Sequence, residues 1–377
     1  MNDPIKYLHH KRSPVWLLRR TTSTLCTDTF SGIILSTTPA TPLYDAHPGG
    51  FLFLGNHDDT SGHMKYAKLA LSVDDQIALL TQRGMVFDDV AAARHTLAHI
   101  NYYRLRAYWL PFEVPAGDTN AADHAFATGT RFDTVLAYYA FDQRLKLLLM
   151  DAIERVEIAL RTRWAHVLSM RYGSHAYLNP ALFANQSHHA KCLQSLQDEV
   201  NRSHETFIKH YLSTYTDPSM PPIWAVCEVL TLGQLSQWLG TLKRRQDRQD
   251  IASAFGFDEK MICTFAHHLA TARNLCAHHS RVWNRKFTIR MKLPTQPVAT
   301  AAWFNLAQDQ RIYNTLLMLT LCVERIKPGS RWLRRVIKLV DTMPAGTTNA
   351  MRFPAGWQSI PVWAKARVLL ANDPAHD

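Results

Sequence analysis

The segment from residue 273 to 285 reads RNLCAHHSRVWNR and holds the side chains best suited to chemistry. An arginine with a histidine can cleave RNA without a metal. The imidazole of His278 would act as general base or acid on the ribose 2′-OH or the leaving 5′-oxygen. The Arg273 guanidinium would stabilise negative charge on the phosphorane. Because DNA has no 2′-OH, this pair of side chains predicts chemistry on RNA.

The spacing of the pair does not identify it. Arg-x4-His occurs at Arg94/His99, Arg161/His166 and Arg273/His278. The chain holds 19 His and is rich in Arg, so pairs with this spacing also arise by chance. What distinguishes the third pair is its surroundings.

A helix over residues 258–284 would place eight polar side chains on one stripe, at about 100° per residue. They are Lys260, Thr264, His267, Thr271, Asn274, His278, Arg281 and Arg285. A solvated face is the simpler interpretation. However, the stripe has no carboxylate, its imidazoles titrate near neutrality, and two arginines end it. We therefore predict that His267, Arg281 and Arg285 contact RNA.

Arg273 lies off this stripe, about 140° around the helix from His278. In a regular helix the two side chains cannot point at one phosphate. Either the helix is distorted between them, or Arg273 of one copy meets His278 of another. The second alternative predicts a homodimer with a shared cleft.

The segment resembles the RN-x-x-x-H signature of HEPN ribonucleases. As a whole it resembles the bacterial Abi-like abortive-infection family of the AbiD/AbiF type. Other blocks resemble that family in the same order: INYYRL at 100–105, YWLPF at 108–112, DAIERVEIALRTR at 151–163, PPIW at 221–224 and LGQLS at 232–236. The resemblance covers residues 64–290, leaves 1–63 outside, and is weak in the last part of the chain.

The resemblance implies an all-α fold, a HEPN-like helical bundle with an N-terminal helical elaboration. It also implies a metal-independent endoribonuclease of phage abortive infection or toxin–antitoxin type. Arg273 and His278 would be the catalytic pair, with Asn274 beside the arginine and His279 as an alternative base. We expect no cofactor, and RNA together with an antitoxin RNA or protein as partners. The alternative function is a non-catalytic RNA-binding HEPN module held by a partner RNA or protein.

A second set of candidate RNA contacts is Arg161, Arg163 and His166, in a helix that a HEPN bundle would place near the signature. Glu154 and Glu157 precede these arginines at helical spacing. Ion pairs within the helix are therefore the simpler interpretation of both arginines.

The aromatic side chains near residue 105 also allow two interpretations. Tyr102, Tyr103, Tyr108 and Trp109 would stack on bases or, more simply, fill a core. Cysteine and histidine near the signature lack the tight spacing of a zinc site, so we predict no metal.

Helices must position all of these residues, and the periodicity predicts them from residue 72 onward. Ser72 followed by Asp75 has a capping-box pattern. No Gly or Pro interrupts residues 131–171, which predicts one long helix or two in close succession. Further helices are expected at about 88–109, 188–215, 223–242, 247–255, 258–284, 303–327 and 331–341. Only residues 288–293 alternate like a strand.

The composition is that of a globular protein. Of 377 residues, 47% are hydrophobic and 19% charged, which argues against wholesale disorder. No apolar run approaches the ~20 residues of a membrane span, and we find no secretory leader. The six cysteines form no CxxC pair. We expect reduced thiols, a cytoplasmic location and no membrane partner.

The net charge is +11, and all of the excess lies in residues 64–377. Such a body usually meets a polyanion, although some basic proteins are merely soluble. Residues 1–63 are rich in Thr, Ser, Pro and Gly, and we expect a disordered extension, or a segment upstream of a true start at Met64. We expect an N-terminal helical region at 64–130, the HEPN-like helical domain at 131–345 and a C-terminal tail at 346–377.

Overall fold

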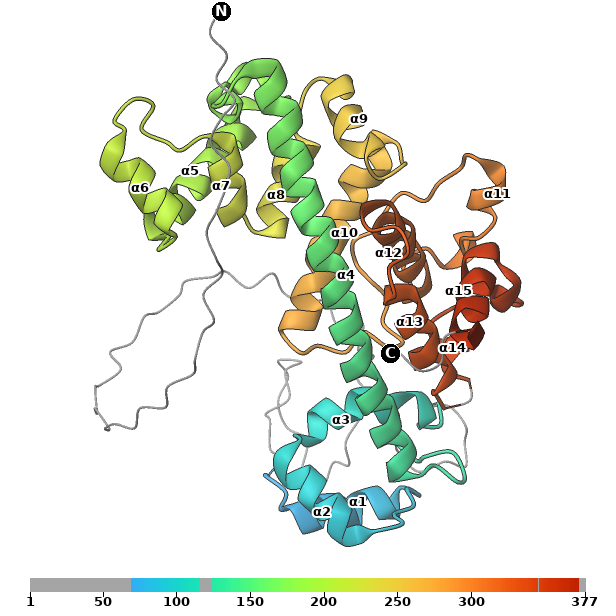
Figure 1. Ribbon diagram of the computed structural model, residues 1–377. Coiled ribbons are helices and arrows are strands. Elements are labelled where there is room, and N and C mark those ends of the chain that lie inside the picture. The colour runs from blue at the N-terminus through green and yellow to red at the C-terminus, as the bar shows by residue number, and fades with distance from the viewer. Residues whose placement is uncertain (1–68, 116–123, 345, 373–377) are drawn as a thin grey trace, which may run out of the picture. The chain divides into compact units, whose positions relative to one another are not determined.

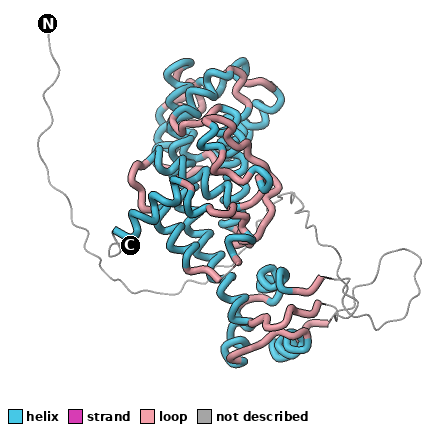
Figure 2. The backbone as a smooth tube through the Cα atoms, turned by 90° about the vertical axis from the view of Figure 1, so that its right-hand side faces the viewer, coloured by secondary structure: helices cyan, strands magenta, loops and turns pink. Residues whose placement is uncertain are grey.

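The computed structural model describes residues 69–115, 124–344 and 346–372, and this part of the chain is helical (Figure 1). Every described residue belongs to one compact unit of the chain. The expectations for residues 1–63 lie outside the described residues. The β structure of the described part is limited to isolated β-bridges, and no strand is present there (Figure 2). The all-α prediction is confirmed, and residues 288–293, which alternate like a strand, form none.

The first described helices are α1 (Val73–Gln82), α2 (Val90–His99) and α3 (Tyr102–Trp109). The predicted capping box starts α1, since the Asp75 N–H donates to Ser72 Oγ at 3.1 Å. One helix was expected over 88–109, but the backbone is extended at Ile100. Asn101 then caps α3 by accepting the Tyr103 N–H, so the chain turns between two short helices.

The long helix α4 (Phe132–Tyr172) organises the unit. It runs uninterrupted for 41 residues, which confirms the long helix predicted there. The apolar face predicted for it is buried at Leu145, Leu149 and Val156. Helices from before it and after it in the sequence pack on it, as Figure 1 shows. Trp332 fastens one of these by donating from Nε1 to the Leu148 carbonyl at 2.7 Å.

The next helices form a cluster on α4. They are α5 (Gln186–Arg202), α6 (Thr206–Thr214), α7 (Ile223–Val229), α8 (Leu232–Gly240), α9 (Arg245–Ser253) and α10 (Glu259–Ala277). Two predicted helices, 188–215 and 223–242, are each broken in two. Ser203 is extended, and Thr231 caps α8 through a capping box with Gln234. α10 packs along α8, α4 and α9.

The chain closes with α11 (Val298–Ala301), α12 (Ile312–Ile326), α13 (Trp332–Asp341), α14 (Thr347–Ala350) and α15 (Pro361–Asn372). α12 packs against α4 and is buried along most of its length. Residues 346–372, set apart above as part of a tail, pack on α13 and bury Trp357 and Trp363. Across the described ranges, no helix is long and apolar enough to cross a membrane.

Candidate functional site

The signature segment begins on α10, which Asp258 caps by accepting the Met261 N–H at 2.9 Å. Ile262, Phe265 and Leu269 bury the apolar face of the helix. On the other face, His267, Asn274 and His278 are exposed. The predicted polar stripe is therefore present as far as His278.

α10 ends at Ala277 and not at 284, so this part of the prediction is wrong. The His279 N–H donates to the Cys276 carbonyl at 3.1 Å and the Ser280 N–H to the Leu275 carbonyl at 2.8 Å. This is the Schellman pattern that ends many helices. His278 is the C-cap of α10, and Arg281 and Arg285 lie beyond the turn and do not continue the stripe.

His279 occupies the left-handed position of this turn, with φ 55°. Glycine is the usual residue there, because a Cβ in this conformation costs about 1–2 kcal/mol. The histidine is exposed, and its carbonyl accepts a 2.7 Å bond from Nη1 of Arg104 in α3. A residue with a strained backbone and an exposed imidazole, next to His278, suits a functional role.

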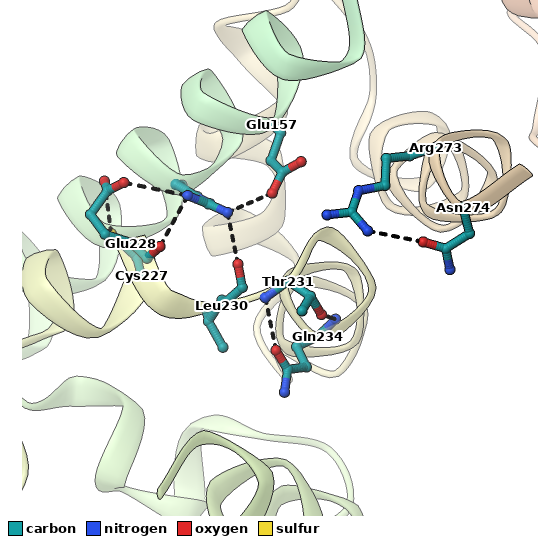
Figure 3. Close-up of polar contacts among 9 residues, drawn as sticks. Glu157, Cys227, Glu228, Leu230, Thr231, Gln234, Arg273 and Asn274 are labelled. Atoms are coloured by element: carbon teal, nitrogen blue, oxygen red, sulfur yellow. Dashed lines mark hydrogen bonds and ion pairs between the residues drawn. The ribbon is translucent and has the colours of Figure 1, made fainter. Parts of the chain in front are cut away.

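Arg273 starts off the stripe, and its guanidinium reaches back to Asn274 at the edge of the stripe. It is half-buried, and its Nη1 donates to Oδ1 of the exposed Asn274 at 3.2 Å. In Figure 3 it extends from α10 towards the side where Glu157 of α4 and the first turn of α8 lie. α10 is one continuous helix from Glu259 to Ala277, so the offset of about 140° between positions 273 and 278 stands.

Arg161, the arginine of another Arg-x4-His pair, is held by structural contacts, and its partners Glu157, Glu228 and Leu230 are labelled in Figure 3. Its Nη2 donates to Glu157 at 2.5 Å and to the Leu230 carbonyl at 2.7 Å. Glu228 lies 3.4 Å from Nη1. The ion pair predicted within the helix is therefore present for Arg161, which ties α4 to the junction of α7 and α8.

Two neighbouring candidates on α4 differ in exposure. Arg163 is half-buried and donates to the Asp250 carbonyl at 3.2 Å. His166 is exposed. His166 is thus accessible, whereas Arg161 and Arg163 both donate to backbone carbonyl groups.

Asp142 of α4 fixes the loop that follows the signature histidines. It is fully buried. Its Oδ1 accepts the N–H groups of Val282 at 3.0 Å and Trp283 at 2.6 Å. Its Oδ2 accepts the Tyr108 hydroxyl at 2.7 Å and lies 3.3 Å from Lys146 Nζ. One carboxylate therefore joins α3, α4 and the loop after α10.

Aromatic packing completes this junction. Trp283 stacks on Tyr138 with ring centroids 4.5 Å apart, and it lies nearly parallel to Tyr108 at 6.3 Å. Burial, and then the neighbouring Asp142, raise the pKa of the Tyr108 hydroxyl. Tyr108 and Trp109 are core residues, whereas Tyr103 is 61% exposed. Of the four aromatics considered for base stacking, Tyr103 is the most accessible.

The two arginines expected to end the stripe have structural contacts. Arg281 Nη1 donates to the Ala107 carbonyl of α3, and burial lowers the pKa of its guanidinium. Arg285 Nη1 lies 3.5 Å from the Arg281 carbonyl. Arg281 is turned toward the protein, and both arginines remain predicted RNA contacts only.

The cysteine within the signature has no reactive character. Burial raises the pKa of the Cys276 thiol to about 12, so it stays protonated at neutral pH. Within the described ranges, no three His, Cys, Asp or Glu side chains gather in a way that could hold a metal. The accessible titratable groups at the end of α10 are the imidazoles of His278 and His279.

Fold and site together define an all-helical protein with an Arg/His signature at the end of a long packed helix. The family described as Abi-like protein matches residues 95–284, just over half of the chain. The chain belongs to this family. Neither the comparison with curated proteins nor the comparison with solved structures gave a match. Asp142 and Arg104, which hold the signature loop, were missed by the sequence reasoning although both lie within the matched residues.

Proposed function

We propose that this protein is a metal-independent endoribonuclease that acts as an effector of abortive infection or as a toxin. Membership of the Abi-like family supports the biological setting. The observation that carries the proposal is the end of α10, where two exposed imidazoles follow Arg273 by one turn and a half, and where Asp142 and Arg104 fix the chain.

The proposed reaction uses only side chains of this segment. His278 takes the proton of the ribose 2′-OH, the 2′-oxygen bonds to phosphorus, and the bond to the 5′-oxygen breaks. A protonated imidazole returns a proton to that leaving oxygen. Arg273 stabilises the charge on the phosphorane. The products are a 2′,3′-cyclic phosphate and a 5′-OH end.

The reaction requires Arg273 and His278 at one phosphate, and we propose that two copies of the chain supply them. α10 is regular up to Ala277, so a distortion between the two residues finds no support in the backbone. In a twofold dimer, the arginine of one copy would face the histidine of the other. The Arg273 guanidinium is positively charged, and the His278 imidazole becomes so when it takes a proton. An RNA bound between the copies would offset the repulsion between these charges and so favour the pairing.

A second candidate function is RNA binding without cleavage. It is favoured by the position of Arg273, whose guanidinium is engaged by Asn274 and extends towards the side of Glu157 (Figure 3). The chain, with its excess of positive charge, would then bind RNA without cleaving it, with an affinity that falls steeply as the salt concentration rises.

Expression in a bacterial host separates the two functions. We expect the wild-type chain to stop growth and cut RNA, and Arg273→Ala and His278→Ala to do neither while remaining folded. Arg144→Ala, which removes an exposed arginine of α4, serves as the matched control. Purified protein should cut RNA in excess EDTA and leave cyclic phosphate ends. Cleavage that survives both signature variants, or that stops on chelation, contradicts the proposed mechanism.

A further inference from the structure

A surface cavity with two adjoining parts, both open to solvent, lies on the segment that follows the signature. The first part has a volume of about 430 Å³ and is lined by Lys286, Arg290 and Arg311 together with Asp309. The second has about 560 Å³ and is lined by apolar side chains, including Val298, Phe304 and Pro354. Leu306 and Ala307 line both parts, so these adjoin. Both volumes lie within the roughly 300–1,000 Å³ of small-molecule sites.

The first part has an excess of positive charge. Arg290 pairs with Asp309 at 3.5 Å and is 67% exposed. Arg311 donates from Nη1 to the carbonyl and amide oxygens of Asn284, at 3.2 and 3.3 Å. Throughout the described residues, neither Arg311 nor Lys286 has a carboxylate partner within ion-pair distance. One carboxylate therefore faces three cations.

Arg311 is held in a place that disfavours its charge. It is half-buried, and its pKa is lowered by burial and then by the nearby charge of Arg352. A guanidinium stays protonated at neutral pH all the same. An anion in the cavity would offset both effects, because it would supply charge-assisted hydrogen bonds to a poorly hydrated arginine.

The second part suits an uncharged, flat or aliphatic group. Val298 and Leu306 at its edge are 67% and 65% exposed. Its polar side chain, Asn305, is engaged, since Nδ2 donates to the Arg352 carbonyl at 2.9 Å. A ligand with an apolar ring joined to an anionic group would fill both parts.

The cavity lies on a different side of α10 from Arg273. The Ile289 carbonyl, next to Arg290 in the chain, bonds to Nδ1 of the buried His268 at 2.7 Å. His268 and Arg273 are five positions apart, which places them about 140° apart around the helix. The cavity is therefore separate from the Arg273 side of the proposed site of RNA cleavage.

We propose that this cavity binds a free nucleoside phosphate, with the phosphate on Lys286, Arg290 and Arg311 and the base in the apolar part. Inorganic phosphate alone would leave the apolar part empty, and a nucleoside alone would leave the cations unpaired. Binding of the whole nucleotide should therefore exceed that of either piece. This ligand is additional to any RNA that Arg273 and His278 would act on.

Calorimetry with the purified full chain tests the proposal, with AMP as ligand and with adenosine and inorganic phosphate as its pieces. We expect AMP to bind at least about tenfold more tightly than either piece, a difference of about 1.4 kcal/mol, because only AMP fills both parts. Arg311→Gln should weaken AMP at least about tenfold. Ala302→Trp should fill the apolar part, whose wall includes the exposed Ala302, and abolish binding.

The matched control is Arg144→Gln, which removes an exposed arginine of α4 and should bind AMP as the wild type does. If Arg311→Gln does not fold, Arg290→Gln, at the exposed cation, replaces it. The proposal is overturned if AMP binds no better than its pieces, or if Arg311→Gln and Ala302→Trp bind like the wild type. It is also overturned if a 12-nucleotide RNA requires Arg311 while AMP does not bind. The readout is independent of RNA cleavage, so failure of one proposal leaves the other standing.

Discussion

Replacing Asp142 should loosen the loop that follows the signature histidines. The carboxylate is fully buried, and it pairs with two backbone N–H groups, the Tyr108 hydroxyl and the Lys146 ammonium group. Breaking a buried ion pair by removing one partner costs about 3–5 kcal/mol. Asp142→Ala leaves all of these donors unpaired and should lose at least that much of a free energy of unfolding that is typically about 5–15 kcal/mol.

Asp142→Asn is the milder change. Its amide oxygen can still accept from Val282 and Trp283, but its NH2 group would face the Lys146 ammonium group. We expect a loss of about 1–3 kcal/mol, the cost of leaving a buried polar group unsatisfied. Urea denaturation, followed by the fluorescence and near-UV circular dichroism of tryptophan, measures it. RNA cleavage should fall along with the order of the loop.

The control for this series is Glu154→Gln on the exposed side of the same helix. A surface change of this kind should stay within about 0.5 kcal/mol. If Asp142→Asn costs no more than Glu154→Gln, the carboxylate does not hold the loop and our account of the junction is wrong.

Three further predictions concern single residues. His279→Gly should stabilise the chain by about 1 kcal/mol, because glycine adopts the left-handed turn without strain; a lower melting temperature would mean that the imidazole makes a compensating contact. Burial lowers the pKa of His268 below the usual 6.5, so the folded chain keeps it neutral while the unfolded chain takes up a proton. Stability should therefore fall as the pH drops below about 6.5, and His268→Gln, which cannot titrate, should flatten that dependence; an unchanged slope would count against it. Arg161→Ala should cost about 1–3 kcal/mol through loss of the contacts to Glu157 and Leu230, whereas Arg144→Ala on the same helix should cost little, and equal urea midpoints would refute the structural role of Arg161.

The sequence predicted the helices whose signals are local. Ser72 and Asp75 form the capping box that their spacing indicates, and the run without Gly or Pro at 131–171 is one helix. The ion pair between Glu157 and Arg161 also follows from spacing along one helix. In both pairs the partners are only three or four residues apart, and the long helix depends on the residues of its own run.

The end of α10 could not be predicted in this way. No Gly or Pro lies between Ala277 and Arg285, and His279 takes the left-handed position that glycine usually marks. The sequence pattern therefore continued the polar stripe to Arg285, whereas the chain turns toward α3. Its direction depends on Asp142, which is 140 residues from Val282 in the sequence. A contact at that distance leaves no trace in the local periodicity.

The central claim is that Arg273 and His278 act together across two copies of the chain. Mixing purified Arg273→Ala with His278→Ala tests it most directly, with each variant alone as the control. In a twofold dimer with composite sites, half of the randomly mixed dimers carry one intact site out of two, so about a quarter of wild-type RNA cleavage should return. Cleavage that stays at the level of the separate variants, or a wild-type chain that light scattering shows to be active as a monomer, would contradict the shared site.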